Sequence, residues 1–309
     1  MSFREQLLAA VAPPSGPDRL DPVVRTVTEE AAFTRSLVEY TVADGHRNEA
    51  YLLVPHDVEP PAPGVLAIHQ HAGRFYVGKS EPAGVSANEE YHYGKELAER
   101  GFVVLCPDLL CFESRRPPEF RREEGTSPDG RAYEKFEAMR YLLAGSTLQG
   151  KYLADLTAGL DYLADHELVD GERLGVIGHS LGGQESIWLA WYDDRVRATV
   201  ASCGMSRYEA IIRDEINHNY AAYVPGLLEL GEIDDVLAGI APRPLFLANG
   251  DQDRIFPSDA VREVFAGLED EYAAADAADR FTGVIVDGAH GFPAAIRSEA
   301  YAFLDGFLR

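Results

Sequence analysis

A serine lies between two glycines in the segment GVIGHSLGGQ, residues 175–184. Gly178 and Gly182 stand two positions before and two positions after Ser180, with an apolar run on one side and an amphipathic stretch on the other. Glycines at this spacing permit the sharp strand-to-helix turn that holds a nucleophilic hydroxyl above the edge of a sheet. A turn serine that merely caps the next helix is the alternative, but the strand–turn–helix context favours nucleophilic chemistry.

A nucleophilic serine needs a base that accepts its proton and a carboxylate that orients the base. The segment LFLANGDQDRIFP (245–257) places Asp251 and Asp253 just after an apolar run, and VIVDGAHGFP (284–293) places His290 just after the next one. The chain order serine, aspartate, histidine is the one that a serine turn of this kind requires. Asp287 also precedes the histidine, and we interpret it as structural.

Two backbone N–H groups should bind the oxyanion that develops when the serine attacks a carbonyl. Leu181, at the start of the following helix, is predicted to supply one of them. The second is expected in HQHAGRF (69–75), from His71 or Ala72. His69 and His71 could also hold a metal, but no third ligand is grouped with them, so the sequence predicts neither a metal nor a cofactor.

Candidate substrate-binding residues lie in two segments that follow apolar runs. Phe75 and Tyr76 are predicted to line a pocket for the acyl group. The segment ESRRPPEFRREEG (113–125) carries four arginines in a strongly acidic chain, namely Arg115, Arg116, Arg121 and Arg122. Such guanidinium groups can bind a substrate carboxylate, although a solvated face paired with the neighbouring glutamates is the commoner outcome.

The elements that must position these residues follow from the pattern of apolar runs. Two alternating segments predict an antiparallel pair of strands at 33–42 and 48–55. Six short continuous apolar runs predict buried strands at 64–71, 101–108, 173–180, 196–203, 243–250 and 280–287. Amphipathic stretches predict helices at 88–100, 151–166, 181–193, 257–269 and 293–308. This alternation predicts an α/β fold with a mostly parallel eight-stranded sheet and helices on both faces.

The domain organisation expected from this pattern is simple. Residues 1–30 are predicted to be a helix and a linker, and residues 31–309 a single domain. Two long connections, at about 109–150 and 204–232, leave the carboxyl ends of predicted strands. Because ligands bind at that edge of α/β sheets, these connections are predicted to be lid-like insertions that form walls of a substrate site.

The strongly acidic composition disfavours several classes of partner. The formal net charge of −23 over 309 residues disfavours nucleic acid and anionic membrane surfaces. The first twenty residues lack a secretory signal and the three cysteines form neither metal-ligand spacing nor a disulfide framework, so a cytoplasmic location is expected. A small-molecule ester is the expected partner, and the sequence leaves a homo-oligomer open.

These segments together resemble an α/β-hydrolase of the dienelactone hydrolase and acetyl xylan esterase-like group, over about residues 45–309. The matching segments include the serine turn, APRPLFLANGDQDRIFP and GAHGFP. The resemblance implies that the acid is the third residue after the glycine, which is Asp253. The chain departs from the group at Gln70 and Ala72, where further glycines are usual. Dienelactone hydrolase itself uses a cysteine nucleophile, and a serine in its place points to esterase chemistry.

The sequence therefore predicts a metal-independent serine hydrolase, most simply a carboxylesterase acting on small acyl esters through Ser180, His290 and Asp253. Two alternatives stay open at this point. The same residues can cleave a peptide or amide bond, as in prolyl peptidase-like enzymes. A hydrolase fold can also serve as a binding module without turnover, because a fold does not fix a function.

Overall fold

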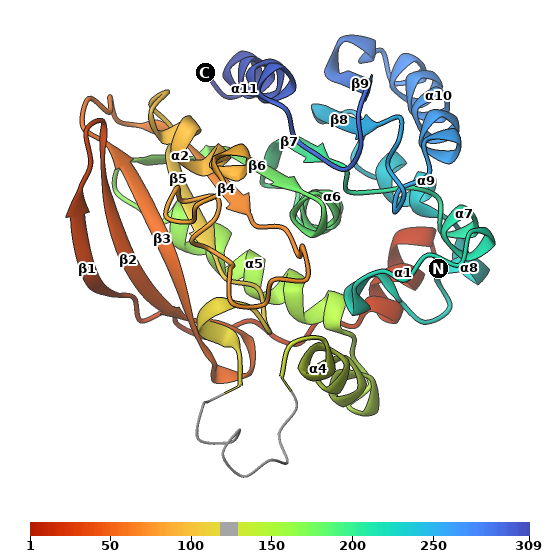
Figure 1. The fold of residues 1–309 in the computed structure, drawn as a ribbon, viewed down its shortest axis with the longest axis horizontal. Helices are drawn as coiled ribbons and strands as arrows, with labels where there is room; N and C mark the ends of the chain where they lie inside the picture. The colour runs from red at the N-terminus through yellow and green to blue at the C-terminus, as the bar shows by residue number, and fades with distance from the viewer. Residues whose placement is uncertain (118–128) are drawn as a thin grey trace.

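The computed structural model describes residues 1–117 and 129–309. Its centre is a nine-stranded sheet with the order β1-β2-β3-β5-β4-β6-β7-β8-β9 (Figure 1). The strands are β1 (Val23–Glu29), β2 (Phe33–Thr41), β3 (Arg47–Pro55), β4 (Ala62–Ile68), β5 (Val103–Pro107), β6 (Val169–His179), β7 (Val196–Ser202), β8 (Leu245–Gly250) and β9 (Phe281–Val286). The pairings from β1 through β3 to β5 are antiparallel, and those from β5 through β4 to β9 are parallel.

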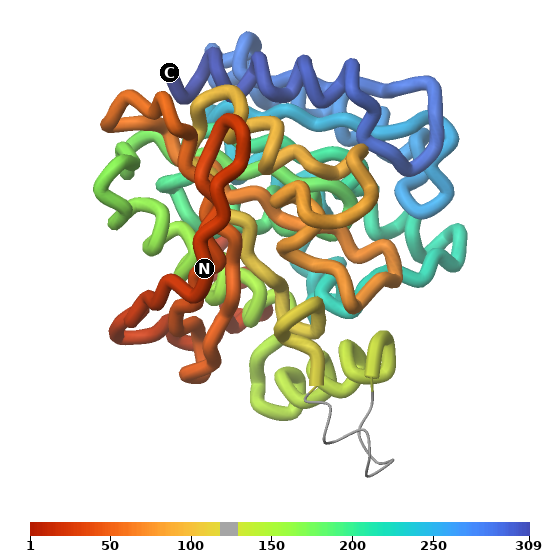
Figure 2. The backbone as a smooth tube through the Cα atoms, turned by 60° about the vertical axis from the view of Figure 1, so that its left-hand side comes forward, coloured from red at the N-terminus to blue at the C-terminus, as the bar shows by residue number. Residues whose placement is uncertain are grey.

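Helices cover both faces of this sheet. The α-helices in the described residues are α1 (Phe3–Val11), α2 (Tyr93–Ala98), α4 (Arg131–Leu143), α5 (Leu148–Ala164), α6 (Leu181–Tyr192), α7 (Tyr208–Arg213), α8 (Leu227–Leu230), α9 (Ile233–Ala238), α10 (Ser258–Ala274) and α11 (Ala294–Leu308). Helices α2 and α11 build one hydrophobic core with the sheet, and α5, α6 and α10 build the other. Figure 2 shows α11 along one end of the molecule and α4 at the opposite end.

The local sequence explains the central strands and helices. All residues of β4 and β5 are buried, which is why their sequences are continuously apolar instead of alternating. Helix α5 begins where the Thr147 hydroxyl accepts a hydrogen bond from the N–H of Gly150, and most of its length is buried against the sheet. Helix α1 begins with a capping box made by Ser2 and Glu5.

The predicted class of fold is confirmed, but the sheet has nine strands instead of eight. The additional strand, β1, lies within residues 1–30, where we expected only a helix and a linker. All seven residues of β1 are exposed, because this edge strand pairs only with β2 and has no core-facing side. An edge strand without a buried face carries no apolar alternation, so the pattern that reveals other strands is missing from it.

The predicted helix at 88–100 is shorter than expected. A 3₁₀ turn at Glu89–Tyr91 precedes α2, which runs only from Tyr93 to Ala98. The Glu90 carboxylate accepts a hydrogen bond of 2.9 Å from the N–H of Phe292. This turn is thus tied to the loop that follows β9, and the helix starts only after it.

The two long connections contribute short helices at the same end of the sheet. Helix α4 lies in the first connection, and α7, the 3₁₀ turn Tyr220–Ala222 and α8 lie in the second. The connections meet where the Glu134 carboxylate accepts a hydrogen bond of 3.0 Å from the N–H of Tyr220. Among the helices of the described residues, none is both long enough and apolar enough to cross a membrane.

Candidate active site

Ser180 occupies a sharp turn between β6 and α6. Its φ of 58° lies in the left-handed region, and its N–H donates a hydrogen bond of 2.8 Å to the carbonyl of Ser202. A Cβ on Gly178 would lie 2.2 Å from the backbone of Gly182, and a Cβ on Gly182 would lie 2.0 Å from the carbonyl oxygen of Ile68. Only glycine fits at these two positions, so the two glycines flanking the serine are required by backbone packing.

The Ser180 side chain does not cap the helix that follows it. The residue stands at the N-cap position of α6, yet its hydroxyl makes no capping hydrogen bond. The alternative interpretation of this serine as a simple helix cap is therefore not supported. A left-handed backbone angle in a residue other than glycine is strained, and such strain is typical of functional sites.

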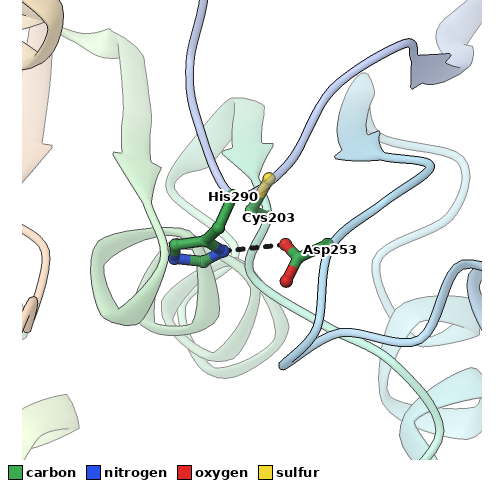
Figure 3. Close-up of side chains that lie close together, drawn as sticks. All are labelled: Cys203, Asp253 and His290. Carbon is green, nitrogen blue, oxygen red and sulfur yellow. Dashed lines mark hydrogen bonds and ion pairs between the residues drawn. The ribbon is translucent and has the colours of Figure 1, made fainter.

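Asp253 is the carboxylate that contacts His290. The Nδ1 atom of His290 lies 2.7 Å from Oδ2 of Asp253 (Figure 3). The other oxygen, Oδ1, accepts hydrogen bonds from the N–H groups of Ile255 and Phe256 at 2.9 and 3.2 Å. Burial raises the pKa of this carboxyl, but its hydrogen bonds and the charge of His290 outweigh burial and lower the pKa below the ordinary value. The carboxylate therefore stays ionised beside the imidazole.

The two other aspartates in this region face elsewhere. The Asp251 carboxylate accepts a hydrogen bond of 3.0 Å from the N–H of Gly288, and Asp287 accepts one from the side-chain amide of Gln252. Both hydrogen bonds hold the two exposed loops together at the ends of β8 and β9. Sequence order alone left Asp251 open as the acid, and the hydrogen bond to His290 distinguishes Asp253 from it.

His290 lies on the loop after β9, with its side chain 25 % exposed. The ring packs between aromatic neighbours, with centroid distances of 4.8 Å to His179 and 5.8 Å to Phe256. Because His179 immediately precedes Ser180, this packing brings the imidazole to the serine turn. With Nδ1 occupied by Asp253, Nε2 is the nitrogen left to accept a proton. Catalytic hydrogen bonds in ligand-free enzymes are often long and shorten when substrate binds.

His179 supports the site by packing. Its Nδ1 lies 3.0 Å from the hydroxyl oxygen of Ser202, and its ring stacks on that of Tyr91 with a centroid distance of 4.8 Å. Burial, with a contribution from His290, lowers the pKa of His179 well below the ordinary value. The neutral ring therefore adds no positive charge next to the serine.

The predicted oxyanion donors lie at the ends of β4 and β6. Leu181 is the first residue of α6, where backbone N–H groups have no partner within the helix. Ala72 has a φ of 45°, so the loop after β4 turns sharply there. In the described part of the chain, no acceptor pairs with the N–H of either His71 or Ala72. Both therefore remain candidates for the second donor.

Glu134 holds this loop and was missed by sequence reasoning. The N–H of Gly73 donates to Nδ1 of His71 at 3.0 Å, which leaves Nε2 of His71 to donate to the Glu134 carboxylate at 3.1 Å. Glu134 is fully buried and also accepts the hydrogen bond from Tyr220. One glutamate of an amphipathic helix carries no local signal of this role, because its partners are distant in sequence.

The predicted substrate-binding residues have different environments. Phe75 is buried and stacks on Phe112 with a centroid distance of 5.0 Å, whereas Tyr76 is 65 % exposed. Arg115 is buried, and its guanidinium donates to the Asp155 carboxylate at 2.6 Å. That guanidinium is buried and paired with an acid of the fold, which argues against Arg115 as a ligand for a substrate carboxylate.

The remaining arginines of the predicted cluster are only partly described. The Nε of Arg116 donates to the carbonyl of Glu113 at 3.2 Å, and the residue is half-buried. Arg121 and Arg122 lie outside the described residues. The commoner interpretation pairs these arginines with the neighbouring glutamates. Arg115 is paired instead with Asp155, a buried residue of α5.

A buried polar network that the sequence did not reveal lies beneath the serine turn. The Glu185 carboxyl group accepts hydrogen bonds from the side-chain amides of Gln149 at 2.7 Å and of Gln184 at 2.9 Å. Gln184 in turn accepts one from the amide of Asn219 at 3.0 Å. Complete burial raises the pKa of Glu185 to about 8. The network connects α5 and α6 with the second long connection.

Comparison with known proteins relates the chain to a family of hydrolases. Residues 49–302 match the Dienelactone hydrolase family. YtaP of Bacillus subtilis (strain 168), which is named as a hydrolase, is 32% identical over 299 residues, covering 94% of this chain and 95% of that protein. Two solved structures share the fold. The glucuronoyl esterase from Solibacter usitatus has a TM-score of 0.72 at 17% identity, covering 99% of this chain and 92% of that one.

The second solved structure is acetyl xylan esterase 1 from Thermoanaerobacterium sp. JW/SL YS485. It has a TM-score of 0.65 at 14% identity, covering 99% of this chain and 93% of that one. Identities this low relate the two solved structures to this chain by fold alone. The family match extends over most of the sequence and includes the turns that carry Ser180, Asp253 and His290. The chain belongs to the dienelactone hydrolase family and is a hydrolase with an α/β-hydrolase fold.

Proposed function

We propose that this protein is a serine esterase that cleaves carboxylic esters with small acyl groups through an acyl-enzyme intermediate. The observation that carries the proposal is the 2.7 Å hydrogen bond between His290 and Asp253, which lies next to the serine turn. A nucleophile, a base and a carboxylate that orients the base are the three groups that this chemistry requires. The names of the two structural neighbours, both esterases, also support ester cleavage.

In the proposed mechanism, the Ser180 oxygen attacks the ester carbonyl while Nε2 of His290 accepts the serine proton. The ionised Asp253 keeps the imidazole in the tautomer that has Nε2 free, and it stabilises the positive charge that develops on the ring. The N–H of Leu181 and that of His71 or Ala72 bind the oxyanion. His290 then gives the proton to the leaving alcohol, and a water molecule activated by the same imidazole releases the acid.

The substrate is proposed to enter from the side where the two long connections meet. A pocket of about 630 Å³ lies between α4 and the second connection, and most of its wall is apolar. It shares Tyr208 and Ile211 with a much smaller cavity that extends to Phe256, the ring beside His290. The small cavity, of about 10 Å³, is too small for an acyl group, so the wide apolar pocket is the part proposed to hold an apolar portion of the substrate.

The test is covalent labelling with a fluorophosphonate, followed by intact mass measurement and peptide mapping. We expect one adduct, on Ser180, that is absent from Ser180→Ala. Ser206→Ala is the matched control, because this buried serine follows β7 near the site and should leave labelling unchanged. Absence of an adduct on folded protein, or an adduct on another residue, would overturn the proposal.

A further inference from the structure

Three different metal-binding side chains converge behind the proposed base. Cys203 follows β7, Asp253 follows β8 and His290 follows β9, and Figure 3 shows the three side chains close together, with His290 directed at Asp253. One potential ligand atom from each lies within 4.8 Å of the others. Cys203 is only 1 % exposed, and its sulfur contacts the carbonyl oxygen of Gly291 at 3.6 Å. The proposed hydrolysis uses the aspartate and the histidine but not the thiol.

Thiolate, imidazole and carboxylate are the ligands that Zn²⁺ prefers, and three protein ligands with one open position form a complete zinc site. We propose that Cys203, Asp253 and His290 form an inhibitory site for a thiophilic divalent cation such as Zn²⁺, which withdraws His290 from catalysis. Binding of the metal does not depend on the proposed function, whereas its inhibitory effect rests on it. The site is distinct from a cofactor site, because hydrolysis proceeds only while it is empty.

The positions of the protons on His290 explain why the bound metal would inhibit hydrolysis. In its neutral form, the imidazole of the metal-free protein carries its proton on Nδ1, which donates to Asp253. When the metal bonds to Nδ1, that proton is replaced and Nε2 takes up a proton, so the imidazole remains neutral. The thiol of Cys203 loses its proton to solvent and its sulfur bonds to the metal. Nε2 then carries N–H instead of a lone pair and cannot accept the proton of Ser180.

The charges and geometry of the cluster suit a divalent cation. One thiolate and one carboxylate offset the two positive charges, so the filled site is neutral within a largely buried region. Oδ1 of Asp253 is held by two backbone N–H groups, which leaves Oδ2 to bind the metal. Two ligands of one tetrahedral zinc lie about 3.3 Å apart, so His290 must move outward by less than an ångström from its 2.7 Å contact, and the Cys203 sulfur, now within 4.8 Å of the other two ligand atoms, must move toward them. His290 lies on the partly exposed loop after β9, which permits this movement.

Direct binding is tested with Co²⁺ titrated into Ser180→Ala, a variant that reports metal binding without any catalysis. We expect one equivalent of Co²⁺ to produce a near-ultraviolet thiolate-to-cobalt charge-transfer band, and Zn²⁺ to abolish it by displacement. Adding Cys203→Ser should remove the band and weaken Zn²⁺ binding at least tenfold, while adding Cys106→Ser, at a buried cysteine in β5, should change neither. A band that survives in the Cys203 variant, or the absence of any band, overturns the site.

Inhibition is tested by the rate of fluorophosphonate labelling with and without Zn²⁺, normalised for each protein to its own metal-free rate. We expect Zn²⁺ to slow labelling of the wild-type protein at least tenfold and to have little effect on Cys203→Ala. Equal inhibition of both proteins overturns the inhibitory role of the site. Circular dichroism melting verifies that each variant is folded. If the wild-type protein is not labelled without metal, the proposed function fails, while the cobalt titration still decides whether the metal binds.

Discussion

At the residue scale, Asp251 and Asp253 make different contacts, although both lie within three positions of the end of β8. Asp253 contacts His290, whereas Asp251 binds the backbone of Gly288. We expect Asp253→Asn to lower kcat for an activated ester by about 10³–10⁴, because the amide favours the wrong imidazole tautomer. Asp251→Asn should lower it by less than about tenfold.

The measurement for this pair is steady-state hydrolysis of a p-nitrophenyl ester of a short acid. Circular dichroism of both variants controls for folding. The assignment of the acid fails if Asp251→Asn is the more damaging of the two.

Glu134 contacts the loop after β4, which carries the candidate oxyanion donors, through His71. It contacts the second long connection through Tyr220. We expect Glu134→Ala to lower kcat with little change in KM, because it loosens a donor of the oxyanion site and not the binding of ground-state substrate. The loss should not exceed the 10²–10³ that removal of a complete donor causes. Glu137→Ala, on the same helix but paired with Arg140, is the control. A pure KM effect would assign Glu134 to substrate binding instead.

At the element scale, the turn between β6 and α6 depends on the closeness of β4. A Cβ on Gly182 would meet the carbonyl of Ile68 at 2.0 Å, so neither the strand nor the helix can accommodate it without moving. We expect Gly182→Ala to lower the free energy of unfolding by about 1–3 kcal/mol and to abolish labelling of Ser180. Urea denaturation followed by fluorescence measures the change.

Gly267 lies in an open environment, so we expect its replacement to have the opposite effect on stability. Gly267 lies on the exposed side of α10, and nothing stands within 4 Å of a Cβ built there. Gly267→Ala should raise the free energy of unfolding by about 0.4–1 kcal/mol, because alanine restricts the unfolded chain and favours the helix. The account of both glycines is wrong if the two substitutions change stability by the same amount.

At the scale of the whole molecule, the buried Glu185 makes stability depend on pH. Its pKa is raised to about 8 in the folded protein, so the folded state keeps a proton that the unfolded chain loses above about pH 4.5. The folded state therefore binds more protons between these two values, and stability falls as pH rises through that window. We expect Glu185→Gln to remove a slope of at most about 1.4 kcal/mol per pH unit.

Urea denaturation of wild-type protein and Glu185→Gln at several pH values between 4 and 8.5 checks this expectation. The variant should gain relative stability steadily toward pH 8, with the two proteins closest at pH 4. Glu172→Gln is the control, because that glutamate is exposed and paired with Arg197 at the surface. A constant difference across the window would mean that Glu185 is ionised in the folded protein.

The sequence by itself determined the class of fold and the positions of the serine turn and the histidine loop. Continuous apolar runs mark strands buried on both sides, and the glycines around Ser180 mark a turn that only glycine can make. These signals are local, because residues adjacent in the chain reveal the burial of a strand and the shape of a turn. The edge strand β1 escaped detection for the same reason, since exposure on both faces leaves no pattern.

Only the tertiary structure decided which groups meet. The hydrogen bond that joins His290 to Asp253 instead of Asp251, the pairing of Arg115 with Asp155, and the contacts of Glu134 with two separate segments all connect residues far apart in the chain. The approach of Cys203 to the same histidine is of this kind as well. Such contacts depend on how strands are ordered and where their carboxyl ends converge, and local sequence does not encode that order.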